Sequence, residues 1–402
     1  MWASADQNNL RYLRQNQPLF RASVRNGLED AIHAADGDVD LHDLGQRVIL
    51  PSSYVGGPRY MQQRFQDSMA LAQYFKKVDI FLTMTTNPNW PEITCELLPG
   101  ETPYDRPDLV ARVFQLKKEA LIKDILNGVL GHVSAYVYSI EFQKRGLPHM
   151  HLLIFFEHSH KLMMPEDIDS LISAHWPDPD KEPMLFETVK QCMVHGLCGA
   201  LNDKAPCMEN GVCTKHYPKE FNERTNMDVN GYPEYYRPDD GKAYMVRNYL
   251  TDNRWIIPYC PFLLAKYNCH INVECAISLS SFKYMFKYIQ KGGDRATMEL
   301  YQCDEIKRYV NGRYISASES GWRILHFDMH GQQPNIVHLQ VYLPGQHMVV
   351  FNPDEDPEAL LQHAAQEKTT LTAFFDANKD PGPLGEEAQK LRQDVCLQYH
   401  LS

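Results

Sequence analysis

The stretch that most constrains the fold of this chain is residues 146–151, Gly-Leu-Pro-His-Met-His, which runs directly into the apolar residues 152–156. A short run of branched and aromatic residues after a Gly/Pro break predicts a buried strand. Side chains alternate between the two faces of a strand, so we expect His149 and His151 to lie on one face. Two imidazoles on one face can hold one divalent metal ion. They can equally be hydrogen-bonded histidines beside a core strand. Other parts of the sequence are needed to distinguish a metal site from a structural pair.

The segments before this strand predict the fold class. Residues 79–86 and 133–142 have strand patterns, and a helical pattern over residues 106–130 separates them. The turn at residues 144–148 joins the second strand to the histidine strand as a hairpin, which makes the two strands antiparallel. The chain is therefore expected to be α+β, with a central antiparallel sheet flanked by helices.

The same hairpin offers a third ligand for a metal ion held by His149 and His151. Glu141 and Gln143 alternate onto one face at the end of the strand before the turn. Either side chain could supply an oxygen ligand, and Gln143 is nearer the turn.

A second metal site is indicated by a cluster of cysteines and histidines. His195 and Cys198 are separated by two residues and Cys207 and Cys213 by five, which is the close-pair spacing of structural zinc sites. Cys192 and His216 are spare candidates. Ten cysteines in 402 residues are too sparse and too uneven for a secreted disulfide scaffold, so the clustering favours bound Zn²⁺.

Residues 281–291 are expected to form a helix that Gly292-Gly293 ends. Tyr284 and Tyr288 then lie one turn apart on one face, beside a basic ridge made by three lysines, Lys283, Lys287 and Lys291. Taken alone, this pattern is typical of an aromatic core face with a solvated edge. Together with a metal site it fits phosphodiester transfer, in which a tyrosine hydroxyl attacks phosphorus and lysines neutralise phosphate charge.

The net charge of −11 does not exclude a nucleic-acid partner, because it is unevenly spread. Residues 351–402 hold ten acidic and four basic side chains, a net −6, and the rest of the chain is only mildly acidic. Neither a run of about 18 apolar residues nor a signal-peptide core occurs, so we expect an intracellular protein without a membrane anchor. The phosphate-binding loop of the common nucleotide hydrolases is also absent from the sequence.

Several motifs in order resemble the Rep nuclease domain of Helitron transposases, which belongs to the HUH endonucleases. The resemblance runs from about residue 50 to about residue 375, and the stretches that carry it are residues 81–93, 141–151, 195–199, 206–208 with Cys213, and 283–291. It implies the HUH fold with an inserted zinc-binding module. It also implies cleavage and rejoining of single-stranded DNA through a 5′-phosphotyrosine in rolling-circle transposition.

Carried over by position, the resemblance implies that His149, His151 and Gln143 hold Mg²⁺ or Mn²⁺. It implies that Tyr284 and Tyr288 are the paired nucleophiles. The expected partners are single-stranded DNA of the transposon ends and the target, and a helicase domain C-terminal to this region in the full-length protein. The expected location is the nucleus.

The sequence suggests three parts: an N-terminal helical region over 1–75, a nuclease core over 76–300 with the zinc-binding insertion at about 190–220, and an extension over 301–402 with strands and an acidic linker. Trp90, Tyr136 and Tyr138 are expected near the sheet as surfaces on which DNA bases stack. A histidine-triad transferase is disfavoured because Leu153 stands where its third histidine belongs. A zinc-containing DNA-binding module and a domesticated remnant, both without catalysis, remain as alternatives.

Overall fold

A computed structural model of the chain describes residues 2–17, 48–142, 146–162, 164–199, 202–227, 233–276, 304–311, 315–341, 370–379, 382 and 398–401. By its internal contacts the chain divides into two compact units. The sheet unit comprises Phe75–Asp294 and Tyr314–Gln333, and the terminal unit comprises Met1–Tyr74, Arg295–Arg313 and Pro334–Ser402.

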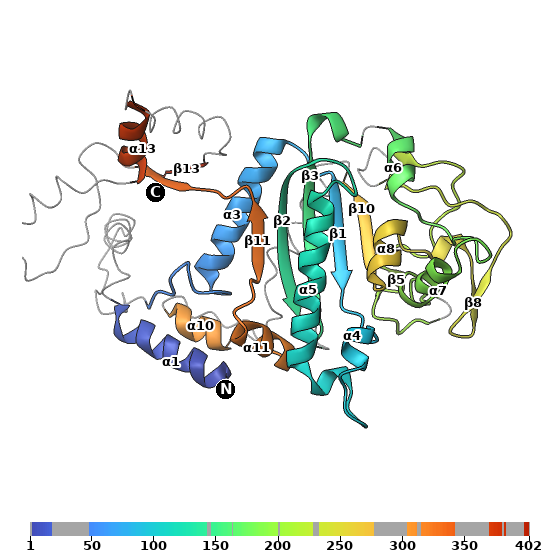
Figure 1. Ribbon diagram of the computed structural model, residues 1–402, viewed down its shortest axis with the longest axis horizontal. Helices are drawn as coiled ribbons and strands as arrows, with labels where there is room; N and C mark the ends of the chain where they lie inside the picture. The colour runs from blue at the N-terminus through green and yellow to red at the C-terminus, as the bar shows by residue number, and fades with distance from the viewer. Residues whose placement is uncertain are drawn as a thin grey trace, which may run out of the picture. The chain divides into compact units, whose positions relative to one another are not determined.

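A five-stranded antiparallel sheet forms the centre of the sheet unit, with strand order β10-β1-β3-β2-β11 (Figure 1). Its strands are β1 (Ile80–Thr85), β2 (Val133–Phe142), β3 (Pro148–Phe156), β10 (Ile271–Cys275) and β11 (His330–Gln333). The expected α+β class with a central antiparallel sheet is confirmed. The hairpin of β2 and β3 pairs as the sequence predicts, with Glu141 opposite His149.

The histidine strand β3 is the middle strand of the sheet, and all nine of its residues are buried. Met150, Leu152 and Ile154 alternate onto one face, where the neighbouring strands also present apolar side chains. Burial of both faces explains why the sequence after His151 is continuously apolar rather than alternating.

Helix α5 (Pro107–Leu126) covers the apolar face of the sheet (Figure 1). Its buried stripe includes Val110, Phe114, Leu121 and Ile125, at the three- and four-residue spacing of an amphipathic helix. The proline at its first position suits a helix start, and Gly128 follows its end with a φ of +88°. The histidines point away from this helix, to the other face.

Helix α11 (Ala317–Ile324) packs against α5 through Trp322, which is fully buried beside Phe114 and Phe142. The next element, β11, brings Gly331 directly opposite Tyr138 on β2. A Cβ at position 331 would lie 2.3 Å from the Tyr138 ring, so only glycine lets the ring lie across this edge strand. Residues 330–333 thereby complete the sheet.

The aromatic side chains expected to stack on DNA bases are largely in this core. Trp90 is 1% exposed and donates its indole N–H to the Tyr267 carbonyl oxygen, and Tyr138 is 6% exposed. The ammonium group of the buried Lys118 lies 3.2 Å from the Tyr138 hydroxyl oxygen. The base-stacking expectation is therefore wrong for Trp90 and Tyr138, because their rings fill the space between sheet and helices.

The segment between β3 and β10 builds a smaller cluster of helices and short hairpins. Its core is apolar and includes Trp176, Val189, Ile256 and Tyr259. The elements of this segment are η3 (His158–His160), α6 (Pro165–Leu171), α7 (Pro183–Cys192), β4 (Met208–Glu209), β5 (Val212–Cys213), β6 (Asn226–Met227), β7 (Pro233–Glu234), β8 (Tyr244–Val246), β9 (Tyr249–Thr251), η4 (Asn253–Trp255) and α8 (Pro261–Tyr267). Two short elements, α4 (Pro91–Thr94) and η2 (Pro103–Asp105), precede α5.

Arg237 holds this cluster together from inside. Its side chain is 3% exposed, and Nη1 donates to the carbonyl oxygens of Ala174 at 3.0 Å, Asn253 at 2.6 Å and Ile256 at 2.7 Å. The guanidinium group thus satisfies carbonyls from segments that are far apart in the sequence.

The terminal unit is described over α1 (Trp2–Gln15), α3 (Pro58–Phe75), α10 (Glu305–Asn311), α13 (Thr370–Lys379), and the parallel strands β12 (His338–Val341) and β13 (Gln398–Leu401). Leu10, Leu50, Ile306 and Tyr309 form its small apolar core. Salt bridges join Arg14 to Asp304 and Arg59 to Glu305. In this unit, residues that precede the sheet unit in the sequence therefore contact residues that come after most of it.

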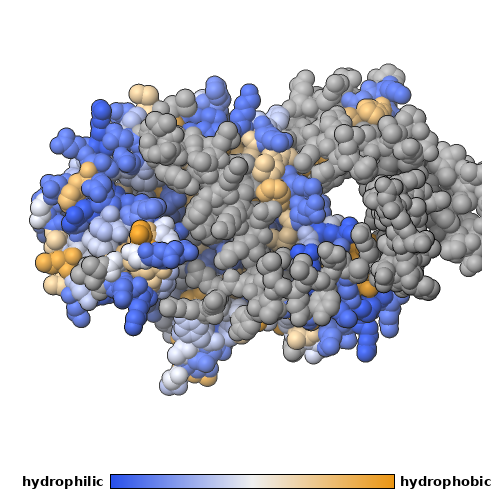
Figure 2. Space-filling model, turned by 180° about the vertical axis from the view of Figure 1, so that it is seen from behind, coloured by the Kyte–Doolittle hydropathy of each residue, from blue (hydrophilic) through white to orange (hydrophobic). Residues whose placement is uncertain are grey.

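Among the described helices, none combines the length and the apolar character needed to span a membrane. On the face that Figure 2 shows, the described surface is mostly hydrophilic, with apolar residues in separate small groups. Such scattered apolar residues are ordinary for a protein surface in water.

Candidate active site and metal centre

The sheet face opposite α5 carries the His-x-His pair, where β1, β3 and β2 lie side by side. His149 and His151 are 6% and 8% exposed. Each histidine faces a threonine of β1 across the strand pair, since Thr85 pairs with His149 and Thr83 pairs with His151. The Oγ1 atoms of Thr85 and Thr83 lie 2.8 Å and 3.1 Å from Nδ1 of their histidines.

The carboxylate of Glu141 enters the same site from β2. Its Oε2 lies 3.2 Å from Nε2 of His151. The hydrogen bonds to threonine use Nδ1 of both histidines, so Nε2 of each is the atom that could ligate a metal ion. Two imidazole nitrogens and one carboxylate are a donor set that would suit a divalent transition metal.

The surroundings favour the neutral form that a ligating histidine needs. Burial lowers the pKa of His149 to about 4, and the neighbouring His151 acts in the same direction. A neutral imidazole keeps a lone pair for a metal ion at neutral pH.

The remaining residues that the sequence assigns to the active site lie outside the described residues. Gln143, the expected third ligand, is one of them. The others belong to the expected helix over 281–291, namely Tyr284, Tyr288, Lys283, Lys287 and Lys291. Of the two candidate oxygen ligands, Glu141 and Gln143, the structure describes Glu141, which lies beside the histidine pair.

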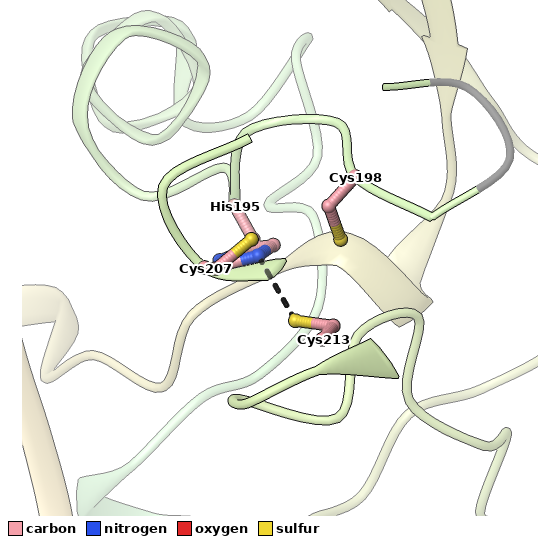
Figure 3. Close-up of side chains that lie close together, drawn as sticks. All are labelled: His195, Cys198, Cys207 and Cys213. Atoms are coloured by element: carbon pink, nitrogen blue, oxygen red, sulfur yellow. Dashed lines mark hydrogen bonds between the residues drawn. The ribbon is translucent and has the colours of Figure 1, made fainter. Parts of the chain in front are cut away.

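A second site lies in the segment between β3 and β10, where the side chains of His195, Cys198, Cys207 and Cys213 converge (Figure 3). Their ligand atoms all lie within 4.8 Å of one another, and Nε2 of His195 is 3.7 Å from Sγ of Cys213. Among the described residues, this is the single group of three or more His, Cys, Asp or Glu side chains gathered in this way. These are the four residues that the sequence selects.

Local chain geometry explains the convergence. Cys207 directly precedes β4, and Cys213 ends β5 after a two-residue turn at Asn210-Gly211. Both turn residues have positive φ, +50° and +80°, as the type I′ hairpin turn of an Asn-Gly pair requires. The hairpin therefore places Cys213 opposite Met208, next to Cys207.

His195 is fixed from the other side of the site. Its backbone N–H donates to the Trp255 carbonyl oxygen, and its ring is stacked on the Tyr217 ring with centroids 4.1 Å apart. Burial lowers the pKa of His195 to about 4, so the imidazole is neutral. The stacked ring presents Nε2 to the cysteines.

The thiols differ in their readiness to lose a proton. Burial raises the pKa of Cys198 to about 12. Burial also opposes ionisation of Cys213, but backbone N–H groups of Tyr217 and Lys215 donate to its sulfur and bring its pKa below the usual value. Cys213 is therefore the thiol that loses its proton most readily, and a bound cation would release the protons of the other two.

The donor set fits a metal ion such as zinc. In a tetrahedral site with bonds of about 2.0 to 2.3 Å, ligand atoms lie about 3.3 to 3.8 Å apart, so the four side chains need to close only slightly. The spare candidates do not join the group. His216 is exposed, and neither its ring nor the Cys192 thiol belongs to the group of converging ligand atoms.

Sequence reasoning missed Thr83, Thr85 and Arg237. The two threonines alternate like the histidines they face, and that repeated period of two was the available signal. Arg237 has no such signal, because the carbonyls that it serves come from separate segments.

The site on the sheet defines a class of protein with a His-x-His pair on a buried antiparallel strand and a carboxylate beside it. Residues 1–154 match a family model described as the Helitron helicase-like domain at the N-terminus, which confirms the resemblance to Helitron proteins over this part of the chain. The matched region includes β1, β2, His149 and His151, and it ends before the cysteine-histidine cluster. The search of curated proteins gave no match.

Proposed function

We propose that this chain is a metal-dependent endonuclease and strand transferase for single-stranded DNA that acts in Helitron transposition. The observation that carries the proposal is the His149/His151 pair on one face of β3, with the Glu141 carboxylate 3.2 Å from His151 Nε2. The match of residues 1–154 to the Helitron N-terminal domain supports a transposon-related role. The proposal includes the HUH fold for the sheet unit.

In the proposed reaction, His149, His151 and Glu141 or Gln143 hold one divalent cation. When bound, the cation polarises the scissile phosphate and stabilises charge on the leaving oxygen. The nitrogen donors make Mn²⁺ a better test ion than Mg²⁺, which prefers oxygen ligands. The lysines at positions 283, 287 and 291 contact the DNA backbone.

The covalent step belongs to Tyr284 or Tyr288. The tyrosine oxygen forms a bond to phosphorus and loses its proton, while the bond from phosphorus to the 3′ oxygen of the upstream nucleotide breaks and that oxygen leaves as a hydroxyl. The products are a 5′-phosphotyrosine and a free 3′ end. Attack by another 3′ hydroxyl reverses the step and joins strands.

The test uses single-stranded oligonucleotides of randomised sequence with Mn²⁺, read on a denaturing gel. A label at the 3′ end should appear on a protein adduct, whereas a label at the 5′ end should appear on a shortened free strand. This pair of labels distinguishes a 5′ linkage from a 3′ linkage. Adduct is expected to disappear in His151→Ala and in the double variant Tyr284→Phe/Tyr288→Phe.

His158→Ala is the matched control, because His158 is an exposed histidine just beyond the same strand. It should leave adduct formation unchanged. DNA binding without adduct in the unchanged protein, across Mn²⁺ and Mg²⁺, would favour the non-catalytic zinc-containing module. Adduct that survives in the double tyrosine variant would move the nucleophile elsewhere.

A further inference from the structure

The two threonines of β1 repeat the spacing of the two histidines of β3. In the antiparallel register, Thr83 pairs with His151 and Thr85 pairs with His149. Each hydroxyl contacts Nδ1 of its own histidine: the distance is 3.1 Å from Thr83 to His151 and 2.8 Å from Thr85 to His149. A Thr-x-Thr segment on one strand thus contacts a His-x-His segment on the next, one residue to one residue.

A hydroxyl group is suited to this contact because it can donate or accept a hydrogen bond. Without metal, Nε2 of a neutral His151 can donate to Glu141, and Nδ1 then accepts from Thr83. A metal ion on Nε2 requires the proton to be on Nδ1, which then donates to the same threonine oxygen. The hydroxyl rotates and neither heavy atom has to move.

We infer that Thr83 and Thr85 are positioning residues that fix the ring orientation and tautomer of His151 and His149 for binding of a divalent cation through Nε2. The inference rests on the proposed function. Outer hydrogen-bond partners of this kind orient ligating histidines and raise their basicity, and their loss typically lowers metal affinity by about 10- to 100-fold. Neither threonine contacts the cation in this assignment.

The test measures Mn²⁺ binding directly, by the electron paramagnetic resonance signal of the free ion, on the full chain with the cysteine-histidine cluster already loaded with zinc. The background from other sites is set with the double variant His149→Ala/His151→Ala. Thr83→Val and Thr85→Val remove a hydroxyl and keep a branched side chain that strands favour. Each should weaken Mn²⁺ binding by about tenfold or more.

Serine variants distinguish loss of the hydroxyl group from a general change in the structure of the strand. Thr83→Ser and Thr85→Ser keep the hydroxyl and remove a methyl group, so they should bind Mn²⁺ within about threefold of the unchanged protein. Alanine variants lack the hydroxyl too and should reproduce the loss seen with valine. If the valine and alanine variants lose Mn²⁺ affinity equally and the serine variants keep it, the loss is due to the missing hydroxyl oxygen.

Thr86→Val is the matched control. The Thr86 hydroxyl donates to the Pro148 carbonyl oxygen at 2.7 Å and not to a histidine, so its loss should lower stability and leave Mn²⁺ affinity unchanged. An equal loss of affinity in Thr86→Val, or unchanged affinity in both valine variants, would overturn the inference. If the double histidine variant binds Mn²⁺ like the unchanged protein, the proposed metal site itself fails.

Discussion

Replacing Arg237 by methionine should open the cluster of helices and hairpins between β3 and β10. The side chain is 3% exposed and lies where two chain segments meet, one at Ala174 and one at Asn253 and Ile256. Methionine has a similar reach and fills much of the space, but it donates no hydrogen bond. The change therefore removes the donors and leaves buried carbonyls in place.

The magnitude follows from the hydrogen-bond geometry. Nη1 carries two hydrogens, which the three carbonyl oxygens share at 2.6 to 3.0 Å. Hydrogen bonds from a charged donor contribute about 1.5 to 3 kcal/mol each, and removing the buried charge recovers part of that. We expect a net loss of about 3 to 5 kcal/mol from the free energy of local opening.

Hydrogen exchange measured by mass spectrometry reads this quantity locally. Amides in peptides that span residues 172–176 and 253–257 should exchange about 100- to 4,000-fold faster in Arg237→Met, since about 1.4 kcal/mol corresponds to a factor of ten. Peptides of β3 should change much less. Arg237→Lys keeps a charge and donors and should lose less protection.

Arg247→Met is the control, because Arg247 is exposed at a hairpin turn. It should change protection by less than about 0.5 kcal/mol. A loss below about 1 kcal/mol in Arg237→Met would refute the reasoning, because the carbonyls would then have found other partners at little cost.

Three further predictions concern the metal centre, pH and packing. Purified chain should contain one zinc ion by elemental analysis, and Cys213→Ser should lose it while Cys192→Ser and His216→Ala keep it; zinc retained in Cys213→Ser would remove that ligand from the set. In metal-free protein, the free energy of unfolding should fall as pH is lowered from about 6.5 toward about 4, because burial depresses the pKa of His149 and His195 to about 4 and the unfolded chain takes up their protons first. Urea midpoints should show a shallower dependence in His149→Gln, and parallel curves would contradict this assignment. Gly331→Ala should cost about 1 to 3 kcal/mol by urea denaturation, because its Cβ would lie 2.3 Å from the Tyr138 ring; the cost should shrink in a Tyr138→Leu background, and a double-mutant cycle without coupling would rule out that contact.

The parts of the fold that sequence predicts well are those whose signal is local. Strand β3 combines a Gly/Pro break with a continuous apolar run, and the four zinc-candidate residues combine cysteine spacing with an Asn-Gly hairpin turn. Strand β11, His-Gly-Gln-Gln, has no strand pattern, and it joins the sheet only through its pairing with β2. Pairing energy between distant segments is invisible in a short window of sequence.

The same distinction separates the found from the missed site residues. His149 and His151 can be found from their residue type and their spacing of two. Their threonine partners depend on the register between strands more than 60 residues apart. The burial of Trp90 and Tyr138 could not be read from their chemistry, because an amphipathic ring suits a core and a DNA surface equally.

The edge position of β11 has a consequence for how the chain is made. Strands β1, β2 and β3 are complete by residue 156, but the strand that covers the free side of β2 is not synthesised until residues 330–333. During translation, or in a fragment cut before residue 330, β2 therefore presents open backbone N–H and C=O groups with Tyr138 beside them. Exposed edges of this kind recruit other strands, so expression fragments that include residues 314–333 should aggregate less than shorter ones.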